Sequence, residues 1–278
     1  MAHRIALFFL LILVIICFIG PLVIEAGEYE IFYDGTGTKI LSLQESTSQH
    51  PLGTDRNGRD VFVRLLYGGR LSLSLAAGVM LLQTLIGISA GLLAGYAGKK
   101  TDLVIMRIVD VFNALPDIVV ILILSALFMA YGVSGRERVL MLMVFLAAFG
   151  WTFIAKIVRS QVLYTRGSSY MMAAELCGIP ALRRLFVYLL PNVLGQVVVA
   201  IPISIGNIIL TEATLSFLGF GLPYPYASWG NMLNEAMDYN ILANHANVWF
   251  PPGLLIVLTV MAFHLVGQGL QKGVFWDE

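Results

Sequence analysis

Long apolar stretches separated by polar segments dominate the hydropathy pattern of this chain. A helix that rises about 1.5 Å per residue needs roughly 20 apolar residues to cross a hydrocarbon core of about 30 Å. Six stretches approach or exceed that length, and the pattern therefore predicts an all-α polytopic membrane protein with six transmembrane helices. The predicted spans are residues 5–23, 71–95, 108–131, 139–155, 193–217 and 248–270.

Two spans have uncertain limits in this pattern. The third is interrupted by Asp110, Asn113, Pro116 and Asp117, and the fourth is short enough that we expect it to continue past Ala155. The first span has a basic start but no small-residue cleavage site after it, so we interpret it as a retained helix and not as a signal peptide.

Composition supports a membrane protein. The chain has 278 residues, of which 58% are hydrophobic and only 12% are charged, and its mean hydropathy is +0.84. Soluble domains are about a quarter charged. Seventeen basic and seventeen acidic residues give a net charge of zero, which argues against a nucleic-acid partner. The two cysteines, Cys17 and Cys177, lie in different contexts and indicate no disulfide framework.

The distribution of Lys and Arg predicts the orientation and three regions of the chain. A small majority of these cations falls in loops that share a side with the N-terminus, so both termini are expected to be cytoplasmic. Residues 1–23 are then the first transmembrane helix, and residues 24–70 are an extracytoplasmic loop. Residues 71–278 form the membrane core with the other five transmembrane helices and a cytoplasmic loop at 156–192.

The second half of the outer loop has a distinct turn-forming sequence. Short polar side chains and glycines favour tight turns over helix between residues 50 and 60. After Asp60, apolar residues fall on one helical face, which predicts a short interfacial helix in which Asp60 and Arg64 pair. An ordinary amphipathic connector and a dedicated functional element remain equal alternatives here. The motif residues are Gly53, Thr54, Asp55, Gly58, Arg59 and Asp60.

Small and polar residues inside the spans indicate packing and a possible hydrated path. Gly87, Gly91 and Gly95 lie four residues apart, a spacing that lets helix backbones approach closely in lipid. A charge at the membrane centre is costly, so Asp117 is a candidate functional residue. Ser204 and three further residues of the fifth span fall on one stripe, with Glu212 beside it. This stripe either lines a path or forms interhelical hydrogen bonds. The path candidates are Asn207, Thr211, Glu212, Thr214 and Asp117.

The loop at 156–192 has the pattern of a short capped helix. Ser168 and Ser169 can cap a helix that spans residues 170–177, and Gly178 suits a left-handed C-terminal cap. A second helical stretch over residues 181–190 is expected to end before Pro191 and Asn192. A capped helix held between two membrane helices can transmit a push from another protein.

This loop resembles the EAA loop of ABC importer permeases. The matching residues are Ala173, Ala174, Glu175 and Gly178, followed by Pro191 and Asn192. Two other segments resemble the C-type permeases of dipeptide, oligopeptide and nickel importers. They are the motif at residues 50–68 and the segments 212–221 and 228–233. Where that family has Pro-Pro before Ser-Trp-Gly, this chain has Pro225-Tyr226-Ala227.

The resemblance implies a fold, partners and a location. It implies a type I ABC importer permease fold in a prokaryotic plasma (inner) membrane, with the EAA loop docked on an ATPase subunit. Expected partners are a second homologous permease, two ATPase subunits, an extracytoplasmic substrate-binding protein and the lipid bilayer. This chain has no ATP-binding loop of its own, because Leu93 stands where the first glycine of that motif is required. ATP and Mg²⁺ are therefore expected on the partner ATPases, and no cofactor in this chain.

The sequence constrains the substrate and the functional class of the protein less tightly than it constrains the fold. The resemblance favours short peptides, with nickel or a metal chelate as the alternative. No cluster of His, Cys and carboxylate residues indicates a metal site. No constellation typical of a membrane enzyme is present, so we expect no enzymatic activity in this chain. A stand-alone secondary transporter is the alternative from another class.

Overall fold

A computed structural model describes residues 2–24, 26–133, 135–223 and 225–276. Within these ranges the chain is helical apart from loops and two isolated β-bridges, Tyr33–Ile40 and Thr54–Asp60. In chain order the helices are α1 (Ala2–Val23), α2 (Val61–Tyr96), α3 (Lys99–Ala114), α4 (Asp117–Ala130), α5 (Gly135–Arg166), α6 (Ser169–Leu176), α7 (Ala181–Arg183), η1 (Arg184–Leu189), α8 (Leu190–Phe217), α9 (Trp229–Leu233), η2 (Asn234–Met237), α10 (Tyr239–Asn244) and α11 (Ala246–Trp276).

The prediction of six spans is confirmed in a modified form. Among the described residues, five helical segments are long and apolar enough to cross a membrane, and α3 and α4 together form a sixth span broken by a 75° bend. The bend lies at Leu115 and Pro116. Leu115 is extended, with φ −87° and ψ 133°, as expected for a residue before proline. The broken span begins at Lys99 and not at residue 108, and α5 continues to Arg166.

A separate interfacial helix before the second span is a wrong prediction. Residues 61–70 are the first turns of α2, and they are continuous with the rest of that helix. Asp60 is the N-cap and its carboxylate accepts a hydrogen bond from the Val63 N–H at 3.0 Å. Val61 is fully buried, so these turns pack inside the protein.

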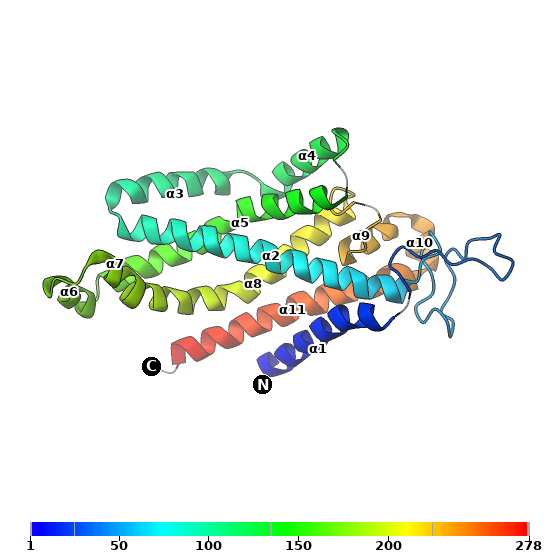
Figure 1. Ribbon diagram of the computed structural model, residues 1–278, viewed down its shortest axis with the longest axis horizontal. Helices are drawn as coiled ribbons and strands as arrows, with labels where there is room; N and C mark the ends of the chain where they lie inside the picture. The colour runs from blue at the N-terminus through cyan, green and yellow to red at the C-terminus, as the bar shows by residue number, and fades with distance from the viewer. Residues whose placement is uncertain (1, 25, 134, 224, 277–278) are drawn as a thin grey trace.

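The long helices lie side by side, and the short elements gather at the two ends (Figure 1). At one end lie α6 and α7. At the other lie α9, α10 and the loop between α1 and α2. A Cβ atom at Gly269 of α11 would lie 2.5 Å from the His3 Cβ of α1, so the start of α1 packs beside the late turns of α11. The first and last helices are therefore antiparallel.

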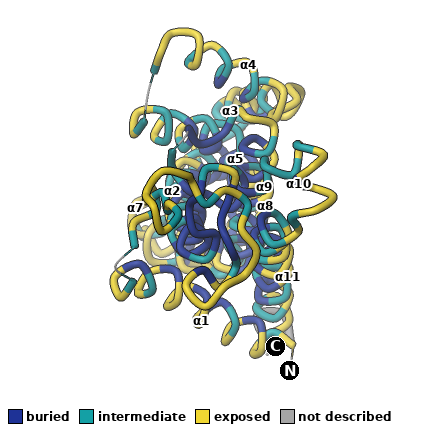
Figure 2. Tube along the Cα trace, turned by 90° about the vertical axis from the view of Figure 1, so that its right-hand side faces the viewer, coloured by how far each residue is buried: buried dark blue, intermediate teal, exposed yellow. Residues whose placement is uncertain are grey.

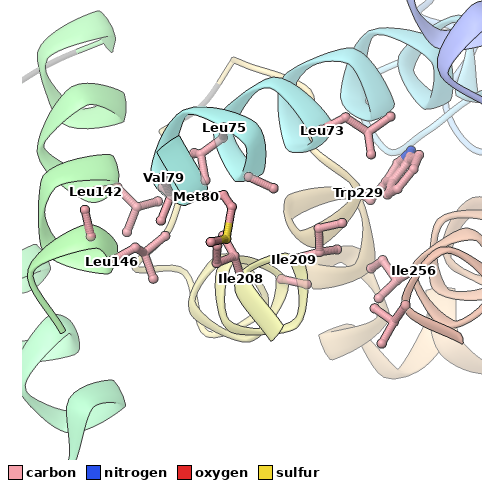
Figure 3. Packing of buried hydrophobic residues seen from close by; sticks show 14 of the residues in the cluster. Leu73, Leu75, Val79, Met80, Leu142, Leu146, Ile208, Ile209, Trp229 and Ile256 are labelled. Atoms are coloured by element: carbon pink, nitrogen blue, oxygen red, sulfur yellow. The ribbon is translucent and has the colours of Figure 1, made fainter. Parts of the chain in front are cut away.

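The core is a seam of aliphatic side chains between α2, α5 and α8. Figure 2 shows buried chain along the middle of the molecule and exposed chain around it. In Figure 3, side chains of α2, α5 and α8 meet, and Trp229 and Ile256 lie near one end of the cluster. Because lipid is as apolar as these side chains, the gain comes mainly from close packing. The labelled members are Leu73, Leu75, Val79, Met80, Leu142, Leu146, Ile208, Ile209, Trp229 and Ile256.

Glycines set how closely α2 approaches α5. A Cβ at Gly87 would lie 2.6 Å from the Ile154 Cβ, and one at Gly91 would lie 2.6 Å from the Val158 Cβ. At Gly95 the nearest atom would be a Val162 methyl group, also at 2.6 Å. The predicted close packing along this glycine stripe is confirmed, and its partner is α5 of the same chain.

The short helix α9 inserts between α2 and α8. The side chains and backbone N–H groups of Ser228 and Asn231 form a reciprocal capping box. Trp229 is completely buried, and its indole N–H donates to the Leu65 carbonyl at 3.0 Å. Gly230 allows the close approach to α8, because a Cβ there would lie 2.6 Å from the Ala213 Cα.

A buried carboxylate joins these three helices. Glu212 of α8 is 1% exposed. It accepts hydrogen bonds from Ser216 at 2.7 Å, from Ser228 at 3.0 Å and from Ser72 at 3.4 Å. Ser72 belongs to α2 and Ser228 is the N-cap of α9, so this cluster, the Glu212 clamp, ties the ends of α2 and α8 to α9.

The glycine seam predicts a steric effect. Gly91→Leu is expected to destabilise the chain by about 1–3 kcal/mol, because the larger side chain overlaps Val158 and α2 and α5 must separate. The measurement is the thermal unfolding midpoint of the detergent-solubilised chain. Gly195→Ala is the matched control, since a Cβ there meets nothing within 4 Å. An unchanged midpoint in Gly91→Leu would contradict the packing argument.

The Glu212 clamp predicts a graded loss of stability. Glu212→Ala removes the acceptor of three buried hydroxyl groups and is expected to cost roughly 3 kcal/mol or more. Glu212→Gln keeps the side-chain volume and one acceptor oxygen, so its cost should be clearly smaller. Thermal unfolding of both variants measures this difference. Equal unfolding midpoints for the two variants would show that hydrogen bonding does not hold the clamp together.

Candidate functional site

A small cavity lined by both polar and apolar residues lies where α2, α4, α5 and α8 meet. Its volume is about 140 Å³. Three of the predicted path residues line it, namely Asp117, Asn207 and Thr211, and the stripe residue Ser204 joins them. The other lining residues are Gln83, Ile121, Leu146, Phe149, Gly150, Phe153 and Ile208.

The break between α3 and α4 places Asp117 at this cavity. Pro116 cannot donate a backbone hydrogen bond, so α3 ends and α4 restarts at Asp117 with a new direction. The Asp117 carboxylate accepts from the Ile118 N–H at 2.8 Å, and the positive end of the α4 dipole favours its charge. Irregular backbone at membrane depth is tolerated where it borders protein or a hydrated cavity.

The polar stripe of α8 remains free for other partners. The Thr211 hydroxyl donates to the Asn207 carbonyl at 2.9 Å, and the Thr214 hydroxyl donates to the Leu210 carbonyl at 2.8 Å. Both bonds stay within α8, and Asn207 and Thr214 are exposed. Within the described part of the chain, these hydroxyls make no bond to another helix, which weakens the alternative of interhelical hydrogen bonding.

Two predicted path residues lie elsewhere. Glu212 follows Thr211 by about 100° of helical rotation and so points into the packed interior, where it forms the clamp described above. Thr214 lies beyond the cavity on the exposed side of α8. Neither residue borders either cavity, and the assignment of both to a translocation path stays a prediction.

Gln83 is a cavity residue that sequence reasoning does not identify. It lies in α2, is 5% exposed, and its amide donates to the Leu146 carbonyl at 2.9 Å. Gly150 makes room for it, because a Cβ there would lie 1.9 Å from the Gln83 Nε2. The available signal was a single amide side chain within an apolar span. The sequence does not show which helix that side chain faces.

A second cavity continues along α5 and α8 toward the end that carries α6. Its volume is about 410 Å³. Phe153 borders both cavities. Three residues further along α5, Lys156 places a positive charge on the wall of the second cavity. The remaining lining residues are Ile157, Ser160, Gln161 and Gln196. None of the residues that line the two cavities is a histidine or a cysteine.

The capped helix in the 156–192 loop is confirmed as α6, which ends at Leu176. Gly178 has φ +72°. The Ile179 N–H donates to the Ala174 carbonyl at 3.1 Å, and the Gly178 N–H donates to the Glu175 carbonyl at 3.0 Å. These two bonds form a Schellman cap, which ends the helix sharply.

The N-terminal cap of α6 differs from the prediction. The Ser168 hydroxyl donates back to the Thr165 carbonyl at 2.6 Å and makes no capping bond to α6. The predicted small face is also divided, since Ala174 packs against the chain and Ala173 is exposed. The exposed surface of α6 includes several apolar side chains, among them Leu176, which is 88% exposed, and also the Glu175 carboxylate.

Two contacts connect α6 to the following helices, and a third lies between η1 and α8. The Glu175 carboxylate pairs with the Arg184 guanidinium at 2.9 Å. The Asn192 amide donates to the Tyr188 carbonyl at 2.7 Å and to the Tyr170 hydroxyl at 3.3 Å. Tyr170 belongs to α6, so Asn192 ties α6 to the start of α8.

The predicted helix end before Pro191 is wrong. The helical segment continues from Ala181 through Pro191 to Phe217. Just before Pro191, η1 is a turn of π-helix. Its wider hydrogen-bond spacing accommodates a residue without an N–H, whose ring would crowd a regular α-helical turn. The α6 loop is thereby continuous with the helix that lines both cavities.

The outer-loop motif folds into a turn closed by buried charges. Gly53 has φ +74°, and a Cβ there would lie 2.1 Å from the Gln44 carbonyl oxygen, so only glycine fits. Gly58 also has φ +74°. Thr54 and Asp60 form an isolated β-bridge, and the Thr54 hydroxyl bonds to the Leu41 carbonyl.

Asp55 is the centre of this turn. Its carboxylate accepts from the Asn57 and Arg59 N–H groups at 2.8 and 2.9 Å and from the Arg59 side chain at 2.7 Å. Arg64 lies 3.3 Å from Asp55, whereas Asp60 contacts His50 at 2.7 Å. The predicted Asp60–Arg64 pair is therefore wrong, because Asp60 is used as the N-cap of α2.

Glu235 of η2 is the fourth member of the charged cluster that Asp55, Arg59 and Arg64 form. It lies 3.9 Å from Arg59. Burial and the neighbouring Asp55 carboxylate raise the pKa of Glu235. The motif and the α9–η2 segment enclose a cavity of about 280 Å³ that Arg59, Arg64 and Glu235 border. The outer loop thus forms one packed unit with the end of the helical bundle.

Comparisons with known proteins agree on the family. The model of the family described as "Binding-protein-dependent transport system inner membrane component" matches residues 87–274. The dipeptide transport system permease protein of Bacillus subtilis is 36% identical over 272 residues, which cover 96% of this chain and 79% of that protein. The glutathione transport system permease protein of Pectobacterium atrosepticum is 39% identical and covers 82% of this chain and 73% of its own length.

A further relative and a solved structure complete the comparison. The oligopeptide transport system permease protein of Bacillus subtilis is 32% identical, with 87% of this chain and 77% of that protein covered. A crystal structure of an amino acid ABC transporter with histidines has a TM-score of 0.56 and 16% identity, and it covers 77% of this chain and 94% of its own. That likeness supports the permease fold. The chain belongs to the family of inner membrane components of binding-protein-dependent transport systems.

Proposed function

We propose that this chain is the transmembrane permease subunit of an ATP-driven importer in a prokaryotic plasma membrane, and that it forms half of a path for short peptides. An extracytoplasmic binding protein delivers the peptide at the end that carries α9 and the outer loop. The end with α6 and both termini is cytoplasmic. The observation that carries the proposal is the continuous helical segment from α7 through η1 and α8, which follows α6 directly in the chain and borders the two cavities.

The α6 loop is suited to transmit a movement made by another subunit. It is capped and exposes apolar side chains, the Glu175–Arg184 pair joins it to η1, and the hydrogen bond from Asn192 to the Tyr170 hydroxyl joins it to α8. ATPase subunits that hold ATP and Mg²⁺ dock on this surface and displace α6 when they close. Because α8 is helical from Leu190 to Phe217, a displacement at its start reaches the residues that line the path.

A second permease subunit completes the path. The cavity residues Asp117, Phe153 and Asn207 are exposed in the single chain. Polar and charged groups at membrane depth normally face a bundle interior or a water-filled cavity. A homologous subunit placed against α4, α5 and α8 supplies the facing wall and removes these residues from lipid.

Peptides are favoured over nickel as the substrate. Relatives over most of the chain are named for dipeptide, oligopeptide and glutathione transport. The two cavities offer amides, hydroxyls, one carboxylate and one ammonium group, which suit a peptide better than Ni²⁺, for which imidazole and thiolate are the stronger ligands. The alternative of a stand-alone secondary transporter is inconsistent with the family.

Reconstitution tests this function directly. The complex that co-purifies with this chain in mild detergent is expected to contain two ATPases and a second permease. In proteoliposomes, it should take up a labelled di- or tripeptide only when ATP and the loaded binding protein are both present. The measurement is peptide accumulated inside the vesicles. Uptake without ATP, or uptake of Ni²⁺ and not of peptide under the same conditions, would overturn the proposal.

The α6 cap predicts uncoupling. Gly178→Trp places a bulky L-residue at a left-handed position on the docking surface, so uptake should fall at least tenfold while ATP hydrolysis continues. The ratio of peptide transported to ATP hydrolysed measures this effect. Gly132→Trp is the matched control, because Gly132 also has a positive φ of +70° and open space around it but lies just after α4. Equal loss in both variants would indicate a general folding defect.

A further inference from the structure

The two cavities follow one another along the same pair of helices. On α5, Leu146 to Phe153 border the first cavity and Phe153 to Gln161 border the second. On α8, Ser204 to Thr211 border the first and Gln196 borders the second. The shared residue Phe153 is 49% exposed. Phe153 therefore separates two compartments, each bordered by polar side chains as well as apolar surface.

Each compartment carries one ionisable group, and the two charges are opposite. Asp117 borders the first cavity and Lys156 borders the second. Both side chains are exposed, and among the described residues neither forms an ion pair. A charge at this depth is unfavourable unless it faces water, a countercharge or a ligand. The wall is thus negative on the α9 side of Phe153 and positive on the α6 side.

Positions on α5 in the middle of each compartment wall lie about as far apart as the ends of a short peptide. Gly150 borders the first compartment and Ile157 the second, and the α-helical rise places them roughly 10 Å apart along α5. An extended chain of three residues spans about 10 Å at most. A free peptide carries an ammonium group at one end and a carboxylate at the other, which is the reverse of the charge order on the wall.

We propose that Asp117 binds the amino terminus and Lys156 the carboxyl terminus of a peptide of about three residues that lies across Phe153. This inference rests on the proposed function and adds a specificity to it. The path then selects zwitterionic peptides in one orientation, with the carboxyl end toward α6. Phe153 contacts the middle of the peptide, where an aromatic ring accepts many different side chains.

A chemical cycle tests the two contacts separately. Tripeptides with free ends, with an acetylated amino end and with an amidated carboxyl end are each loaded on the binding protein and offered to the reconstituted complex. Asp117→Asn should lower uptake of the free and amidated peptides about tenfold and leave uptake of the acetylated peptide at the wild-type rate. Lys156→Gln should lower uptake of the free and acetylated peptides and spare the amidated one.

Two surface variants are the matched controls. Asp110 and Lys100 are exposed residues of α3 that border neither cavity, so Asp110→Asn and Lys100→Gln should transport all three peptides like the wild type. If Asp117→Asn and Lys156→Gln each lower uptake of every peptide by the same factor, the two residues pair with the facing permease subunit and the inference is wrong. An unchanged uptake in both variants also overturns it.

A second measurement applies if the binding protein rejects a blocked peptide. A carbodiimide joins a carboxylate to an amine in direct contact. With the free tripeptide in the wild-type complex, mass spectrometry should find Asp117 bonded to the peptide's amino end and Lys156 bonded to its carboxyl end. Bonds at neither residue, or at other residues only, would overturn the inference. Failure of the wild type to take up any free peptide would instead refute the proposed function.

Discussion

The close approach of α2 and α5 is the constraint on which the rest of the structure depends. Gly87, Gly91 and Gly95 bring the two backbones together because no side chain separates them. Within lipid, such contact must replace the solvent-driven attraction that operates in water. With α2 and α5 in contact, α8 packs against both, and its polar stripe remains on the open side of the bundle beside Phe153.

Two kinds of polar group occur within the membrane spans: some are buried and hydrogen-bonded, and others are exposed with few partners. At the Glu212 clamp, three hydroxyl groups satisfy a carboxylate that is almost completely buried. At the first cavity, Asp117 and Asn207 are exposed in the single chain and have few internal partners. A satisfied buried group holds helices together, whereas groups with spare hydrogen-bonding capacity are available to water, a substrate or a second subunit.

The two ends of the molecule differ in how firmly they are joined to this bundle. The outer end is tied by buried charges around Asp55 and by Trp229, which is completely buried. The α6 end is held by a few contacts, among them the Glu175–Arg184 pair, in which Glu175 is 68% exposed. An end with few buried contacts moves at a lower free-energy cost than a packed one. The α6 end can therefore be displaced while the outer end keeps its structure.

Local features of the sequence determined the number of spans, the capped helix α6 and the glycine seam. Each depends on residues close in the chain: apolar runs of sufficient length, a glycine at a left-handed cap, and small residues one helical turn apart. The resemblance in the 50–68, 173–192 and 212–233 segments likewise indicates the family from the sequence alone. The sequence indicated that Pro116 and Asp117 interrupt the third span, but it did not predict the bend there or the start of α3 at Lys99.

Only the tertiary structure decided which polar groups meet. Glu212 is next to Thr211 in sequence, yet one is buried in a clamp and the other borders a cavity, because adjacent helical residues face directions about 100° apart. Asp60 was the nearer sequence partner of Arg64, but the turn at residues 53–58 brings Asp55 to Arg64 and leaves Asp60 to cap α2. Gln83 and Lys156 come to the cavities from helices far apart in the chain. These contacts depend on how whole helices pack against one another, and no local sequence pattern specifies that packing.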